Sequence, residues 1–171
     1  MLLAEELLGH ARFLANLDPG TTTQANIRRA ISAAYYAAFH LLAAEVAEQV
    51  SPDAPPGLRE RTQRALGRMQ MQKVAKAFSQ VGATKVRDLP DDIILPQPVS
   101  RELALIGSRF KELQDERHAA DYDVSKHFAP SDASAQVQKA EDFFRDWKIE
   151  KSSSNAPVFL ASLMFGRHWN K

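Results

Sequence analysis

Five residues that could perform acid–base or ionic chemistry lie within seven consecutive positions. They are Arg117, His118, Asp121, Tyr122 and Asp123. Histidine can accept or release a proton near neutral pH, and arginine can hold the negative charge of a phosphate group without a metal ion. Residues 117–123 are therefore the strongest candidate in this chain for a reactive site, and proton transfer beside a phosphate is the chemistry that these residue types could perform.

The same residues also have structural explanations. Arg117 and Asp121 are four positions apart, which is the spacing of an ion pair along one helix, worth about 0.3 kcal/mol at an exposed site. Asp121 could instead pair with Arg28 or Arg29, and such a contact would fix the register of two helices. A metal site is a weaker alternative, because the carboxylates around His118 lack a recognised ligand spacing. We predict no metal and no cofactor.

The elements that position these residues are expected to be helices, because apolar side chains recur at steps of three and four residues. The expected helices cover residues 3–17, 21–49, 58–80, 100–117 and 130–148. Thr21 with Gln24 matches a capping box, Ser100 can cap the fourth helix, and Pro130 with Ser131 opens the fifth. Prolines assign 51–57 and 83–98 to connections. The chain is thus predicted to be an all-α, up-and-down bundle of four to five helices with a proline-rich connection and a C-terminal apolar tail.

Composition limits the classes of protein to consider. The chain has 171 residues, 44% of them hydrophobic and 25% charged, which is the balance of a globular domain. Its formal net charge of +1 predicts neither a strongly basic nucleic-acid-coating protein nor an acidic tail. Cysteine is absent, so disulfides and thiolate metal sites are excluded. We expect a cytoplasmic protein with no signal peptide and no membrane span, and no glycine-rich phosphate loop is present.

Two segments together resemble the HEPN superfamily. The first, from Arg28 to His40, reads RRAISAAYYAAFH, and the second, 117–123, reads RHAADYD. They are most similar to the branch with an AYYAxFH helix and a later R-x-x-ADY signature, and the similarity covers roughly residues 2–148. The resemblance implies a helical bundle that frequently dimerises. It also implies membership in a group of proteins that includes RNA-cleaving toxins, nucleotide-binding modules and partners of small nucleotidyltransferases.

The RNA-cleaving members of this superfamily use an arginine with a histidine a few residues later, and two copies meet across a dimer. In this chain Tyr122, Asp123 and Val124 occupy the positions where that histidine would follow Arg117. Tyrosine is a poor base at neutral pH, because its unperturbed pKa is about 10. His118 is adjacent to Arg117, and neighbouring helical side chains diverge. We therefore expect a binding module without robust catalysis. The alternative is a metal-independent endoribonuclease in which Arg117 clamps phosphate and His118 or Tyr122 transfers the proton.

Further binding residues are candidates on two other helices. Tyr35, Tyr36 and His40 could face a ligand or partner, although core packing explains them as well. The segment 58–80 carries six Lys or Arg residues and one Glu. Three of the arginines share one face of a single predicted helix and could follow a phosphate backbone, or they could form an ordinary solvated face. These arginines are Arg61, Arg64 and Arg68.

The chain is expected to comprise a bundle at residues 1–150 and a tethered apolar segment at 151–171. The sequence PVFLASLMFGRHW after a serine-rich tether must be hidden from water, in a groove of its own bundle or on a second subunit. We favour a homodimer or docking of a partner. Nucleotide or single-stranded RNA is the expected ligand, and a nucleotidyltransferase or an antitoxin is the expected protein partner.

Overall fold

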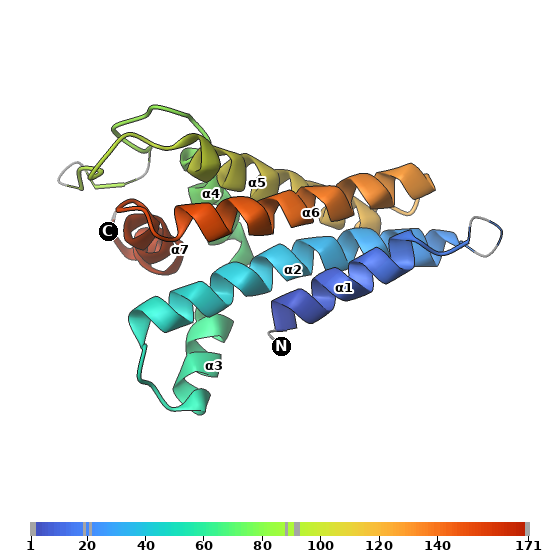
Figure 1. Cartoon of the computed structure of the whole chain (residues 1–171), viewed down its shortest axis with the longest axis horizontal. Helices are drawn as coiled ribbons and strands as arrows, with labels where there is room; N and C mark the ends of the chain where they lie inside the picture. Colours follow the sequence, from blue (N-terminus) through green and yellow to red (C-terminus); the bar gives the residue numbers. More distant parts are fainter. Residues whose placement is uncertain (1–2, 19, 21, 88, 91–92, 170–171) are drawn as a thin grey trace. The chain divides into compact units, whose positions relative to one another are not determined.

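The computed structural model describes residues 3–18, 20, 22–87, 89–90 and 93–169. Within these residues it contains seven helices and no strand, which confirms the predicted all-α class (Figure 1). The helices are α1 (Leu3–Ala15), α2 (Gln24–Val50), α3 (Pro56–Ala65), α4 (Arg68–Ala77), α5 (Arg101–Tyr122), α6 (Pro130–Glu150) and α7 (Ala156–Trp169).

The helices form two compact units. The first unit contains the chain up to Leu41 together with Arg109–Phe144, and the second contains Leu42–Ser108 together with the chain from Arg145 onward. Helices α2, α5 and α6 each contribute residues to both units.

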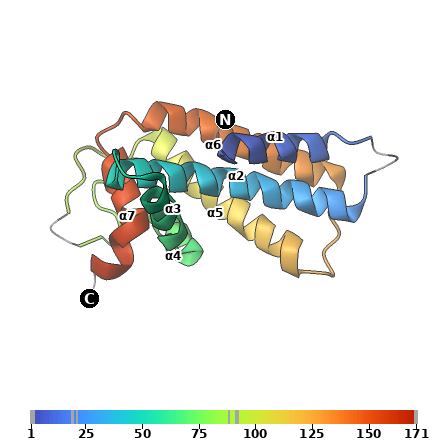
Figure 2. The same ribbon diagram turned by 90° about the horizontal axis from the view of Figure 1, so that it is seen from below.

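The first unit is built from α1 and parts of α2, α5 and α6. In Figures 1 and 2, α1 lies alongside the N-terminal part of α2, and Leu14 of α1 packs with Ile27 and Ile31 of α2. Ala120 of α5 and Phe128 of the following loop complete the same buried cluster. Ala30 of α2 belongs to this cluster as well, and its small side chain lets the neighbouring helices approach closely.

Helix starts follow the local chemistry of the sequence. Ser100 Oγ accepts a hydrogen bond from Leu103 N at 2.9 Å, which confirms Ser100 as the cap of α5. Helix α6 begins at Pro130, as predicted. Thr21, predicted to cap α2, lies outside the described residues. Thr23 Oγ1 accepts a hydrogen bond from Asn26 N at 3.2 Å, so Thr23 caps α2.

Helix α2 is the one helix in the described part of the chain that is long and apolar enough to cross a membrane. However, 72% of its most apolar stretch of eighteen residues is buried inside the protein. Burial of this extent is typical of the core helix of a folded domain, in which apolar side chains contact other helices.

In the second unit, the single helix predicted for residues 58–80 is wrong. Two helices, α3 and α4, occupy this segment, and Leu66 and Gly67 between them have extended backbones with ψ of 119° and 123°. Leu66 is buried, and glycine destabilises a helix interior by about 1 kcal/mol relative to alanine. The chain therefore ends one helix, buries Leu66 and starts another.

The C-terminal apolar segment forms α7 and packs on α4 within the second unit. Phe159 of α7 is fully buried, with ring centroids 5.2 Å from Phe78 and 6.2 Å from Trp147. The buried side of this segment is thus covered by its own chain, which is the first of the two positions that the sequence leaves open. The side-chain amide of Asn155 links the start of α7 to the loop before α5, because it donates a hydrogen bond to Gln97 O at 2.9 Å.

Candidate functional site

Arg28 of α2 binds the backbone around the C-terminal end of α5. Its guanidinium donates hydrogen bonds to Ala120 O at 2.7 Å, Asp123 O at 3.0 Å and Lys126 O at 2.5 Å. It also lies 5.2 Å from the centre of the Phe128 ring. The last carbonyls of a helix have no partner within the helix, and a cationic donor satisfies them well. Arg28 therefore stabilises the backbone of residues 120–128, and its guanidinium is hydrogen-bonded to three carbonyl groups of the same chain.

Arg117 and Asp121 form the centre of a hydrogen-bonded network between α5 and α2. Arg117 Nε is 2.8 Å from Asp121 Oδ2, and Arg117 Nη2 donates to Tyr36 Oη at 2.7 Å. Asp121 Oδ1 accepts a hydrogen bond from Ser32 Oγ at 2.5 Å. The arginine and aspartate side chains are 11% and 22% exposed. Of the pairings that the sequence left open for Asp121, the structure contains the one with Arg117.

Aromatic rings enclose the Arg117 guanidinium on two sides. Its central carbon lies 5.3 Å from the ring centres of both Tyr36 and Tyr122. Burial alone would lower the pKa of Arg117, but the charge of Asp121, followed by the contributions of Tyr36 and Tyr122, raises that pKa above its ordinary value. Arg117 is thus a permanent cation whose charge is neutralised by a neighbouring carboxylate.

His118 and Tyr122 lie together on the exposed side of α5. Their ring centres are 5.0 Å apart, His118 is exposed, and Tyr122 is 62% exposed. Arg117, one position before His118, is turned toward Tyr36 of α2. The imidazole and the guanidinium therefore face different surroundings within one copy of the chain, as expected for adjacent residues of a helix.

The loop after α5 is held by Asp123 and Lys126. Asp123 Oδ1 accepts hydrogen bonds from Ser125 Oγ at 2.6 Å and from the backbone N–H groups of Ser125 and Lys126. The Ser125 hydroxyl is the main cause that lowers the pKa of Asp123 below its ordinary value. Lys126 Nζ is 2.9 Å from Glu116 Oε2. The carboxylates of Asp123 and Glu116 therefore stabilise the loop. In the described residues, no group of three His, Asp or Glu side chains is arranged to hold a metal ion.

The aromatic residues of α2 differ in exposure. Tyr35 is fully buried, with its ring 5.7 Å from Phe110 of α5, which matches the core explanation for this residue. Tyr36 is half-buried and forms the hydrogen bond with Arg117. His40 is half-buried, with its ring 6.5 Å from that of Tyr36. Arg29, next to Arg28, is exposed.

The basic residues predicted to share one helical face lie on two helices of the second unit. Arg61 and Arg64 belong to α3, whereas Arg68 begins α4. All three are exposed, and Arg64 Nη2 is 2.8 Å from Glu60 Oε2. The extended backbone at Leu66 and Gly67 interrupts the helical register, so a continuous stripe along one helix is wrong for this set.

Comparison with known proteins gives no further assignment, because the chain matches no known family model, no curated protein and no solved structure.

Two features of the site were not recognised in the sequence. Ser32 holds the second oxygen of Asp121, and Arg28 acts on backbone carbonyls, whereas the sequence suggested a carboxylate partner for it. The spacing of Ser32, one helical turn after Arg28 on α2, is the signal that could have placed it on the same face.

The Arg117–Asp121 pair is expected to couple more strongly than an exposed pair of the same spacing. A double-mutant cycle with Arg117→Ala and Asp121→Ala should give an interaction free energy of about 1.5 kcal/mol, because both side chains are shielded and hydrogen-bonded to α2. The matched control is the cycle on Arg64 and Glu60, which share the four-residue spacing but are 75% and 62% exposed. That cycle should give about 0.3 kcal/mol in urea unfolding. Equal interaction free energies in the two cycles would contradict the network of Arg117 and Asp121 with α2.

Proposed function

We propose that this chain is a HEPN-like, dimerising helical module that binds RNA and lacks robust catalysis. The observation that carries the proposal is the ion pair of Arg117, because the cation of the RHAADYD segment is held by Asp121 and Tyr36 of its own chain. A catalytic arginine must be able to meet the charge that develops on phosphate in the transition state. Here a carboxylate already occupies that position.

The protonation chemistry of the segment supports the same proposal. His118 is exposed beside Tyr122, whereas Arg117 donates a hydrogen bond to Tyr36 and forms an ion pair with Asp121. A general base must lie within hydrogen-bond reach of the group that it deprotonates, while the phosphate is held by the cation. Within one copy of the chain, the arginine and the histidine do not converge on a common point.

A metal-independent endoribonuclease remains the second candidate. It is favoured by the exposure of His118 and Tyr122, whose side chains are accessible to a substrate or to a second copy of the chain. In that case a composite site would form across a dimer, with Arg117 as the phosphate clamp. Cleavage would require Asp121 to release Arg117, or a second cation from the partner copy.

Exposed arginines of the second unit are the proposed RNA contacts. Arg61, Arg64 and Arg68 lie on α3 and α4, which carry a single acidic residue, Glu60. Single-stranded RNA binds to such surfaces mainly through its phosphates, with release of counterions. The proposal includes a cytoplasmic location. It also includes a nucleotidyltransferase or an antitoxin as the protein partner.

The test is a binding and cleavage assay with labelled single-stranded RNA in the presence of a chelator. We expect saturable binding at low salt, intact RNA after prolonged incubation, and a dimer by light scattering. The triple variant Arg61→Gln, Arg64→Gln, Arg68→Gln should bind about tenfold more weakly. Its salt dependence should be less steep by about two, since each phosphate contact on a single strand contributes about 0.7 to the slope.

A charge-matched control separates this surface from net charge. The triple variant Arg101→Gln, Lys148→Gln, Arg167→Gln also removes three exposed cations of the second unit and should bind RNA normally. Absence of saturable binding by the unmodified chain would overturn the proposed function. Cleavage that is lost in Arg117→Ala would establish the endoribonuclease instead.

A further inference from the structure

Helix α3 differs from α4 and α7 in how little of it is buried. Thr62 is the one buried residue among the ten of α3, and Leu58 is 50% exposed. The Thr62 hydroxyl donates a hydrogen bond to Leu58 O at 3.1 Å, so its polar group is satisfied within α3 itself. Separation of α3 from its neighbours would therefore expose little apolar surface and would leave this hydroxyl with its partner.

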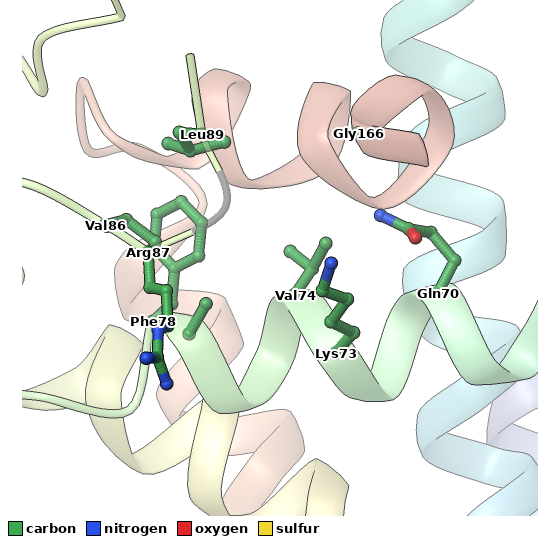
Figure 3. Close-up of a pocket in the computed structure, with 9 residues that line it drawn as sticks. Gln70, Lys73, Val74, Phe78, Val86, Arg87, Leu89 and Gly166 are labelled. Carbon is green, nitrogen blue, oxygen red and sulfur yellow. The ribbon is translucent and has the colours of Figure 1, made fainter. Parts of the chain in front are cut away.

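Helix α4, which follows α3 and also has ten residues, is held firmly. Its residues Met71, Val74 and Ala75 are buried. Figure 3 shows the Gln70 amide directed toward α7 at Gly166, and a Cβ atom at Gly166 would lie only 2.7 Å from Gln70 Nε2. Helices α4 and α7 are thus in close contact. Two helices of equal length that adjoin in sequence therefore differ sharply in the packing that stabilises them.

Both ends of α3 adjoin backbone that is not helical. Pro55 precedes its first turn, and no side chain caps that turn. After its last turn, Leu66 and Gly67 have extended backbones, and Leu66 is buried. Isolated helices shorter than about 12 residues are marginal in water, and α3 has ten residues with an uncapped start. The stability of α3 in place must therefore come mainly from contacts with the rest of the second unit.

An ion pair between Arg59 and Glu48 ties α3 to the C-terminal part of α2. Arg59 Nη1 lies 2.8 Å from Glu48 Oε2, and Arg59 Nη2 donates a hydrogen bond to Pro52 O. The side chains of Arg59 and Glu48 are 37% and 58% exposed, so water screens their attraction. Arg59 Nε is buried and has no hydrogen-bond partner in the described part of the chain, and separation of α3 would let water satisfy it.

We propose that α3 is a hinged arm, which is latched to α2 by Arg59 and Glu48 and opens as a unit about the break between α3 and α4, while α4 stays in place. The arm carries Arg61 and Arg64, which are already exposed, and Arg59, whose guanidinium contacts Glu48. A phosphate group can replace the Glu48 carboxylate as the partner of Arg59, because a guanidinium binds either anion through charge-assisted hydrogen bonds. The use of the arm in binding rests on the proposed RNA function, whereas its opening does not.

Amide hydrogen exchange of the free, full-length chain tests the opening. Relative to their rates in an unfolded chain, the hydrogen-bonded amides of α3 should exchange about 100-fold faster than those of α4, because a poorly buried unit opens locally at low free energy. Glu48→Gln should speed the exchange of α3 about threefold further and leave α4 unchanged. Glu45→Gln is the matched control, because Glu45 lies on the same helix, carries the same charge and pairs with Lys151, which is outside α3.

Binding of labelled single-stranded RNA tests the use of the arm. Glu48→Gln should bind RNA about threefold more tightly than Glu45→Gln, with a salt dependence steeper by about 0.7, since the released Arg59 adds one phosphate contact. Exchange in α3 as slow as in α4, or an equal effect of the two variants on that exchange, would overturn the arm. Equal RNA affinity of the two variants would overturn the role of Arg59 in binding. Absence of RNA binding by the unmodified chain would overturn the proposed function, and the exchange experiment would still decide whether α3 opens.

Discussion

Replacement of Gly107 by alanine is expected to lower the free energy of unfolding by about 3 kcal/mol. Gly107 lies in α5, and a Cβ atom there would overlap the carbonyl oxygen of Ala75 and lie 3.3 Å from Ser79 N. Both obstacles are backbone atoms at the C-terminal end of α4, so they cannot move aside by a change of rotamer. The loss should exceed the gain of up to about 1 kcal/mol that alanine gives over glycine in a helix. Urea unfolding monitored by circular dichroism measures it.

Gly9 provides the matched control for this prediction. It is also a glycine inside a helix, in α1, but a Cβ atom there would meet nothing within 4 Å. Gly9→Ala should therefore raise the free energy of unfolding by about 0.5 kcal/mol through helix propensity and the reduced freedom of the unfolded chain. If Gly107→Ala stabilises the protein as Gly9→Ala does, the close approach of α4 and α5 is wrong.

The helical class could be predicted from sequence because it depends on local patterns. Apolar spacing of three and four residues, the cap at Ser100 and the start at Pro130 each act within one turn of chain. The break at Leu66 and Gly67 was missed, because the helical spacing of charged residues on either side of it masks a single glycine. The break between α3 and α4 accompanies the burial of Leu66, which depends on contacts with distant parts of the chain.

The site could be predicted only in part. A contact of the segment around Arg28 with residues 117–123 was predicted from the charges, as a possible ion pair of Asp121 with Arg28 or Arg29. Hydrogen bonds from Arg28 to Ala120 O and from Ser32 to Asp121 confirm the proximity but not that ion pair. The partners within the site could not be assigned from sequence, because carboxylates and backbone carbonyls compete for the same guanidinium. The structure assigns the carboxylate to Arg117 and the carbonyls to Arg28. Arg28 receives the carbonyls because α5 ends at Tyr122, which leaves the last carbonyls of the helix without partners within it.

For the C-terminal segment, composition predicts burial but not the surface that provides it. Its apolar composition correctly required a buried position, and Phe159 is fully buried. Composition does not identify the surface that provides the burial, because a groove in the same chain and a groove in a second subunit offer the same apolar contact. The small residue at Gly166 and the apolar side chains of α4 together make the contact within the chain possible.

Arg28→Ala is expected to lower the free energy of unfolding by about 3 kcal/mol, because three backbone carbonyls would lose a charged donor at once. Phe128 would also lose the guanidinium that lies over its ring. Arg28→Lys should recover less than half of this loss, since one ammonium group cannot span carbonyls that the planar guanidinium reaches together. Urea unfolding gives the free energies. Hydrogen exchange should show faster exchange confined first to the end of α5 and the loop at 123–128.

Arg29→Ala is the control for this last prediction, because it removes the same side chain from the next position of α2. Arg29 is exposed, and its substitution should change the free energy of unfolding by less than about 0.5 kcal/mol. Equal losses for the two alanine variants would mean that the effect comes from charge or helix propensity, and the capping role of Arg28 would be wrong. A large loss for Arg28→Ala alone would show that an arginine of the RRAISAAYYAAFH helix shapes the RHAADYD segment through its backbone. Any ligand role of that segment would then depend on Arg28 without requiring it to touch the ligand.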